Sequence, residues 1–203
     1  MKQLVRRQLA QSIATLQAVL DDQHLADTIV TIGELTARAM ATGNKLLVAG
    51  NGGSAADAQH LVAEFVVRLT VNRPALRAIA LTTDSSILTA TGNDFGFDLV
   101  FARQIEALGQ PGDIFLGIST SGNSPNIINA INQANSQGIT TIGFTGNGGG
   151  AMRPLCHHNV IIPSNVTMNI QESHLALEHI FCMVVERFSF GMDFDTRPQF
   201  LSE

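Results

Sequence analysis

Two groups of polar side chains could carry out proton transfer or bind a metal ion. His60 and Glu64 are four residues apart, and a helix would place both side chains on one face. The second group lies in the otherwise apolar C-terminal region and comprises Gln171, Glu172, His174, Glu178 and His179. Buried polar groups need partners. A solvated helix face with His174 held by a hydrogen bond would explain the same pattern without any chemistry.

The spacing of Gln171 and His179 limits how they could share a ligand. They are eight residues apart, which is about 12 Å along an ideal helix. They can hold one metal ion if it lies between them, if Gln171 precedes the helix proper, or if neighbouring subunits contribute. The sequence leaves these three arrangements open.

A loop rich in hydroxyl groups lies between an apolar run and a helical pattern. Ser119, Thr120, Ser121 and Ser124 supply four hydroxyls within six residues. Unpaired N–H groups and the helix dipole at the start of a helix also attract anions, so this loop could surround a phosphate. A plain polar loop with a capping residue would explain one or two of these hydroxyls. The sequence therefore favours phosphate binding.

Two glycine clusters follow other apolar runs. In residues 50–54 (GNGGS) the glycines allow the backbone to approach a ligand, and Ser54 can cap the next helix. This is not a Walker loop, because no Gly-Lys-Ser/Thr follows. The cluster at 146–150 lacks the G-x-G-x-x-G spacing and a ribose carboxylate about 20 residues later. We interpret it as a flexible turn and exclude a nicotinamide enzyme.

Alternating elements must position these loops. Apolar runs bounded by turn residues lie at 45–49, 76–81, 113–119, 140–145 and 160–163. Helical patterns lie at 3–20, 26–42, 54–70, 95–109, 124–137 and 170–189. This alternation predicts an α/β fold with a five-stranded parallel sheet covered on both faces, and ligands beyond the carboxyl ends of the strands. We expect one domain over 1–203, with a helical arm (1–42), an α/β core with the C-terminal helix (43–190) and a tail (191–203).

Composition argues against several classes of protein. The net charge is −5, and no Lys/Arg block could follow a phosphodiester backbone, so we expect no nucleic-acid partner. No apolar run approaches the roughly 20 residues of a membrane helix, and the N-terminus has the spacing of an amphipathic helix rather than a signal peptide. The chain is 45% hydrophobic and only 14% charged, which suggests that other subunits cover apolar surface. The isolated Cys156 and Cys182 predict reduced thiols and a cytosolic location.

Three segments resemble the signature segments of bacterial phosphoheptose isomerases. They are GNGGSAADAQHLVAEF, TATGNDFGFDLVFARQIEALGQPGDIFLGISTSGNSPN and NIQESHLALEH, in the family's order, and the resemblance extends over residues 1–190. It implies a three-layer, flavodoxin-like, doubly wound SIS domain and a cytoplasmic homotetramer. It also implies an aldose–ketose isomerase that converts sedoheptulose 7-phosphate to D-glycero-D-manno-heptose 7-phosphate through an enediol, toward the heptose of lipopolysaccharide.

The same resemblance implies roles for individual residues. Zinc would be bound by His60, Glu64, Gln171 and His179. The phosphate would be held by Ser119, Thr120, Ser121 and Ser124. The rest of the substrate would be contacted by Asn51, Gly52, Gly53, Ser54, Asn93, Asp94 and Gln171. Glu64 would act as the catalytic base, and His179 would exchange protons with the substrate oxygens.

Two positions depart from the family's usual pattern. Asn169 stands where the family often has arginine, and Met168 at a position that varies, which affects sugar contacts at this edge of the pocket.

Some relatives are non-catalytic and associate with the replication initiator, but they lack the acid and the last histidine that Glu64 and His179 supply here. A sugar-phosphate-sensing regulator would need a helix-turn-helix segment or a basic surface, and we find neither. An isomerase of another phosphosugar stays open.

Overall fold

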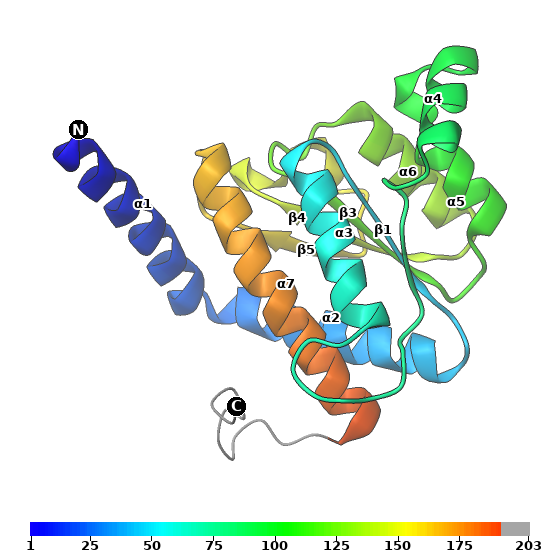
Figure 1. Ribbon diagram of the computed structural model, residues 1–203, viewed down its shortest axis with the longest axis horizontal. Helices are drawn as coiled ribbons and strands as arrows, with labels where there is room; N and C mark the ends of the chain where they lie inside the picture. Colours follow the sequence, from blue (N-terminus) through cyan, green and yellow to red (C-terminus); the bar gives the residue numbers. More distant parts are fainter. Residues whose placement is uncertain (192–203) are drawn as a thin grey trace.

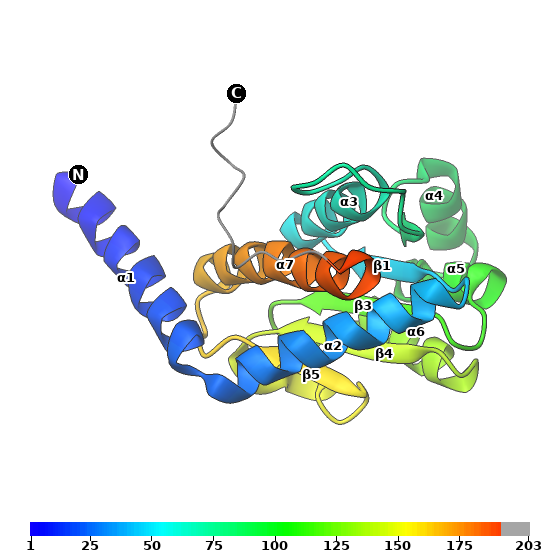
Figure 2. The same ribbon diagram turned by 90° about the horizontal axis from the view of Figure 1, so that it is seen from below.

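The computed structural model describes residues 1–191 and contains a five-stranded sheet between two layers of helices (Figures 1 and 2). The strands are β1 (Leu46–Gly50), β2 (Ala78–Ala80), β3 (Ile114–Ser119), β4 (Thr140–Thr145) and β5 (His158–Ile161). Their spatial order is β2-β1-β3-β4-β5, and every neighbouring pair is parallel. The predicted parallel sheet is therefore confirmed. Because β1 lies between β2 and β3, the strand order reverses there, and ligands of open sheets bind at such a reversal.

Seven α-helices and two short 3-10 helices connect the strands in residues 1–191. They are α1 (Lys2–Asp21), α2 (Gln23–Ala41), α3 (Gly53–Val66), α4 (Ser85–Asp94), η1 (Phe97–Leu99), α5 (Ala102–Leu108), α6 (Pro125–Ser136), η2 (Asn147–Met152) and α7 (Thr167–Phe190). The helix expected at 95–109 is divided into η1 and α5. Helix α4 was not predicted, because its sequence SSILTATGND lacks an apolar stripe. Its start is fixed by Asp84, whose carboxylate accepts a hydrogen bond from the Ile87 N–H at 2.8 Å.

Alternate residues of each strand point to opposite layers. Because consecutive strand residues are apolar, both faces of the sheet are apolar. Leu46, Val48 and Leu116 pack with helices α2, α3 and α7 on one face. Leu47 and Phe115 pack with α5 and α6 on the other. Both faces are therefore buried, as the continuous apolar runs in the sequence indicated.

The helical N-terminal region is present, and its two helices differ in how they pack. Helix α2 buries Leu25, Ile29 and Ile32 against the core, and α2 and α7 pack closely along their lengths. Helix α1 has no buried residue and projects from one end of the molecule (Figures 1 and 2). This difference is not visible in the sequence, because both helices have apolar residues at helical spacing.

Helix α2 ends with a common stop signal. Thr42 is the C-cap residue of α2, and Gly43 has a φ of +91°, a conformation that glycine adopts readily. Within residues 1–191, every helix is too short or too polar to cross a membrane. The expected tail at 191–203 lies outside the described residues, apart from Gly191.

Close packing between α2 and α7 gives a test of the fold. A methyl group on Gly33 of α2 would overlap the side chain of Val184 on α7. Overpacking costs about 1–3 kcal/mol, more than the roughly 1 kcal/mol that Ala gains over Gly inside a helix. We expect Gly33→Ala to lower the free energy of unfolding in urea denaturation. Gly92→Ala in α4 is the matched control: a Cβ there meets nothing within 4 Å, so this variant should be equally or more stable. Destabilisation by both substitutions to the same extent would contradict this account.

Candidate active site

Three side chains that could bind one metal ion meet between α3 and α7. His60 Nε2 lies 2.9 Å from His179 Nε2 and 3.6 Å from Glu64 Oε1. The three donor atoms all lie within 4.8 Å of one another. Ligand atoms of a tetrahedral zinc ion, each about 2.0–2.1 Å from the metal, lie roughly 3.4 Å apart. Two imidazole nitrogens and one carboxylate oxygen at these separations fit one such ion, with only small adjustments of the side chains.

This trio of His60, Glu64 and His179 forms because α3 and α7 lie side by side and run in the same direction (Figure 1). At the start of α3, Gly53 lies so close to Gln171 that a methyl group on Gly53 would overlap the Gln171 amide. Seven residues later on α3, His60 meets His179 of α7. The Gly53–Gln171 and His60–His179 contacts are thus about two turns apart on both helices.

Gln171 lies apart from the trio in this chain. Because α7 begins at Thr167, Gln171 is inside the helix, which excludes the arrangement in which it precedes the helix proper. Its amide lies against Gly53, and Gly53 and His60 are about 10 Å apart along the helix axis. The structure therefore brings together three of the four expected metal ligands and places Gln171 near the glycine turn.

The hydroxyl loop gathers three of its four side chains at the N-terminus of α6. Ser119 Oγ lies 2.9 Å from Ser124 Oγ and 3.5 Å from Ser121 Oγ. Ser124 is the N-cap residue but makes no side-chain capping bond, and Pro125 occupies the first turn. The hydroxyls therefore point toward one another, in front of backbone N–H groups at the positive end of the helix dipole. The Thr120 carbonyl oxygen accepts a hydrogen bond from the Gly146 N–H at 3.1 Å.

A reciprocal pair of amides joins the glycine turn to the hydroxyl loop. Asn51 Nδ2 donates to Asn126 Oδ1 at 2.9 Å, and Asn126 Nδ2 donates to Asn51 Oδ1 at 2.8 Å. Asn126 is only 2% exposed. The pair ties the turn that follows β1 to the first turn of α6. It also occupies the Asn51 side chain that we expected to contact the substrate.

The glycine cluster at 146–150 supports the hydroxyl loop and is not the flexible turn that we expected. A side chain on Gly122 would overlap the Gly149 carbonyl, and a Cβ on Gly150 would come 2.5 Å from the Ser121 carbonyl oxygen. The Met152 N–H donates to the Gly122 carbonyl at 3.0 Å. Three of these glycines also have positive φ angles. The cluster is glycine-rich because two backbone segments touch there.

The remaining expected substrate residues lie in two places. Gly52, with a φ of +57°, is the N-cap of α3, while Ser54 is buried inside the first helical turn. Ser54 therefore does not cap the helix as we had expected. Asn93 and Asp94 lie exposed at the end of α4, where Asn93 Nδ2 donates to Asp94 Oδ1 at 2.7 Å. Among the described residues, these two side chains bond to each other and not to either loop.

Buried polar groups lie next to the trio, so the interpretation of this α7 face as solvated is wrong for His174 and Glu178. Glu178 is fully buried, and neither carboxylate oxygen hydrogen bonds to a described residue. Burial, aided by the nearby Asp57, raises the pKa of Glu178 to about 8. Burial also raises the pKa of Asp57, although His60 opposes this shift. For His174, burial lowers the pKa to about 4, and the expected hydrogen bond is confirmed by a 3.1 Å contact between Nε2 and the Thr145 carbonyl.

Asn169 contacts another helix in this chain. It is 3% exposed, and its amide nitrogen lies 3.1 Å from Ser12 Oγ and 3.2 Å from Glu172 Oε2. It therefore links α1 to the first turn of α7. The preceding Met168 is 55% exposed.

Asn126 and Asp57 belong to the site but were not predicted from the sequence. Asn126 follows Pro125 in the first turn of the helix behind the hydroxyl loop, so its position next to the loop was visible. Asp57 precedes His60 by three residues, a spacing that places both on one helix face. The contacts across the fold that matter for both residues, with Asn51 and Glu178, are not visible in the sequence.

Comparisons with known proteins show which family the chain resembles. The profile of the SIS domain matches residues 9–146. The phosphoheptose isomerase of Burkholderia pseudomallei strain 1710b is 49% identical over 187 residues, covering 92% of this chain and 95% of that protein.

Two solved phosphoheptose isomerases have the same fold. The structure from Neisseria gonorrhoeae has a TM-score of 0.86 at 40% identity, covering 91% of this chain and 98% of the other. The structure from Francisella tularensis has a TM-score of 0.88 at 34% identity, with coverages of 91% and 97%. The chain therefore belongs to the phosphoheptose isomerase family of SIS-domain proteins, which are aldose–ketose isomerases.

Proposed function

We propose that the protein converts sedoheptulose 7-phosphate to D-glycero-D-manno-heptose 7-phosphate with the help of a zinc ion, for the synthesis of heptose in lipopolysaccharide. The main support is the meeting of His60, Glu64 and His179 in one group of donor atoms. The hydroxyl loop lies beside the glycine turn that begins α3, and the trio lies about two helical turns further along. A ketose 7-phosphate carries its phosphate and its carbonyl at opposite ends, which suits two sites separated in this way.

The protein side chains would divide the reaction between them. The hydroxyl loop would hold the phosphate and so align C1 and C2 with the reacting groups. Glu64 would take a proton from C1 and deliver it to C2. His179 would donate a proton to the oxygen on C2 and accept one from the oxygen on C1. A bound zinc ion would polarise the carbonyl and stabilise the negative charge of the enediolate.

Glu64 and His179 would then serve both as metal ligands and as proton carriers. A carboxylate held tightly by a cation is a poor base, because the cation stabilises its charged form. Either the coordination loosens during turnover, or only one of the two residues moves protons. His60 has no proton role in this scheme and would remain a ligand throughout.

We further propose a homo-oligomer, in keeping with the expected tetramer, in the cytoplasm. Helix α1 exposes an apolar stripe that includes Leu9, Ile13 and Leu20, whose exposed fractions are 59%, 67% and 75%. The stripe continues into an apolar groove of about 370 Å³ between α1, α2 and α7. Another copy of the chain would remove this surface from water. The two free cysteines agree with a reducing compartment.

Replacing the proposed base gives a direct test of the mechanism. We expect Glu64→Gln to reduce kcat for sedoheptulose 7-phosphate by at least about 10²-fold, because the amide cannot accept the proton. Circular dichroism should show an unchanged fold. Glu106→Gln, an exposed glutamate paired with Arg103 on α5, is the control and should keep full activity. Near-native turnover by the Glu64 variant would remove Glu64 from the proposed mechanism.

The phosphate loop predicts an effect on substrate affinity. A hydrogen bond to a charged group contributes about 1.5–3 kcal/mol, so Ser124→Ala should raise KM roughly 10- to 100-fold. It should also weaken inhibition by inorganic phosphate. Ser136→Ala, at the other end of α6, should change neither value, because that hydroxyl only donates to the Gln133 carbonyl. If Ser124→Ala leaves KM and phosphate inhibition unchanged, the loop is not the phosphate site.

The exposed stripe predicts a change in molecular mass. A charge placed in an apolar interface is costly to bury, so Ile13→Asp should dissociate the assembly or lower its association constant strongly. Light scattering coupled to size-exclusion chromatography would measure the mass. Gln11→Asp adds the same charge to an exposed residue on the opposite side of α1 and should leave the mass unchanged. A wild-type protein that is monomeric at micromolar concentration would contradict the proposed assembly.

A further inference from the structure

Arg73 is a buried arginine whose guanidinium has partners on several sides. Its Nε donates to Glu186 Oε1 at 2.6 Å, and its two terminal nitrogens donate to the carbonyl oxygens of Glu64 at 2.7 Å and Phe65 at 2.8 Å. A further bond of 3.1 Å reaches the Pro74 carbonyl. The Arg73 side chain is 1% exposed and that of Glu186 is fully buried. A guanidinium this well satisfied holds its surroundings in one geometry.

Two of the carbonyl groups that Arg73 contacts, those of Glu64 and Phe65, belong to the last turn of α3. That helix ends at Val66, so Glu64 lies in the turn that is most prone to fraying. The last carbonyls of a helix have no partner within the helix, and a cation there also interacts favourably with the helix dipole. Arg73 supplies both the donors and the charge. It therefore holds the backbone of Glu64, one of the three metal-binding candidates, in helical geometry.

The acidic partner of Arg73 lies on the other helix of the site. Glu186 follows His179 by seven residues, so both lie on the same face of α7, two turns apart. Thr70 Oγ1 donates to the second carboxylate oxygen of Glu186 at 3.3 Å. One guanidinium thus joins the end of α3, which carries Glu64, to the face of α7 that carries His179.

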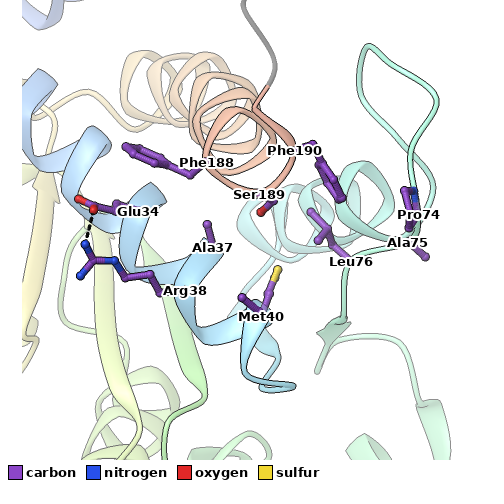
Figure 3. Close-up of a pocket in the computed structure, with 11 residues that line it drawn as sticks. Glu34, Ala37, Arg38, Met40, Pro74, Ala75, Leu76, Phe188, Ser189 and Phe190 are labelled. Atoms are coloured by element: carbon purple, nitrogen blue, oxygen red, sulfur yellow. Dashed lines mark hydrogen bonds and ion pairs between the residues drawn. The ribbon is translucent and has the colours of Figure 1, made fainter.

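The segment that carries Arg73 is itself supported by the end of α7. Pro74, Ala75 and Leu76 line a pocket of about 410 Å³ together with Phe188 and Phe190, and Figure 3 shows Phe190 beside Leu76. The Phe190 ring centre lies 6.0 Å from Arg73 Cζ, at the outer limit of a cation–π contact. Arg73 is therefore held from the α7 side both through Glu186 and through this aromatic contact.

We propose that Arg73 and Glu186 form a positioning pair for the metal centre. They set the distance between the end of α3 and α7, and so bring the donor atoms of Glu64 and His179 to the spacing that one cation requires. This inference rests on the proposed metal-assisted function. A buried ion pair with a purely structural role would change stability without a selective change in metal affinity.

The experiment compares metal affinity with stability in the full-length protein. Zn²⁺ would be titrated against a chromophoric chelator in the wild type, Arg73→Lys, Arg73→Met and Glu186→Gln, with folding checked by urea denaturation. Lysine keeps the charge but cannot reach Glu186 and both carbonyls of α3 together. The matched control is Lys45→Met, which breaks another largely buried ion pair, with Asp113 at 2.6 Å, at the opposite ends of the strands. The absorption spectrum of bound Co²⁺ would report the coordination geometry.

We expect each folded Arg73 or Glu186 variant to bind Zn²⁺ at least tenfold more weakly and to show an altered Co²⁺ spectrum. Lys45→Met should lose stability but keep its Zn²⁺ affinity within twofold. Wild-type affinity and spectrum in Arg73→Lys and Glu186→Gln would overturn the inference, as would equal weakening in Lys45→Met. A wild-type protein that isomerises its substrate without binding Zn²⁺ would instead overturn the metal centre itself. Glu186→Gln, which keeps the shape of the pair, decides the question if loss of the guanidinium prevents folding.

Discussion

The site depends on the parallel packing of α3 and α7 in one register. Gly53 lies against Gln171, and about two turns later His60 meets His179. A shift of one helix by a single turn, about 5.4 Å, would separate the two histidines completely. The register is held at both ends. At the start of α3 the Gln171 amide lies directly against Gly53, and at its end Arg73 joins the last turn to Glu186. A metal-binding group made from two separate helices needs such restraints, because neither helix alone presents more than two of its members.

A second contact connects this helix pair to the sheet. The glycine turn that ends β1 also begins α3, so the place of α3 depends on how β1 ends. Asn51 and Asn126 tie that turn to the start of α6, and the glycines at 146–150 support the hydroxyl loop from the other side. The loop lies at the carboxyl ends of the strands and the trio lies about two turns along the helix that begins there, so both are parts of one framework. A substrate held at the loop would be positioned relative to α3 through backbone and amide contacts.

The sequence predicted the elements better than the contacts between them. The continuous apolar runs identified all five strands, because a parallel sheet buried on both faces requires them. Helix α4 was missed because its Ser, Thr and Gly residues give no apolar period, and α2 was assigned to an arm because periodicity does not say which partner a helix has. In the site, the i,i+4 spacing of His60 and Glu64 was visible, and the resemblance to the family supplied His179. The Asn51–Asn126 pair and the Arg73–Glu186 pair join residues 75 and 113 positions apart. No local pattern reports contacts at such separations.

The α3–α7 interface also contains groups that do not favour folding. Glu178 is buried without a hydrogen bond to any described residue, and its pKa of about 8 lies well above its ordinary value of 4.5. The folded chain therefore binds this proton more tightly than the unfolded chain does. The contribution of Glu178 to the free energy of unfolding therefore decreases as the pH rises from 4.5 toward 8. An apolar residue of similar size would avoid this loss, since burying an unpaired polar group is unfavourable. Such groups are tolerated where the surrounding packing is strong, and here α2 covers α7 while Arg73 holds the end of α3. Polar groups that weaken the fold thus lie next to the candidate metal-binding residues. The packing that compensates for them comes from α2, which covers α7, and from Arg73 at the end of α3.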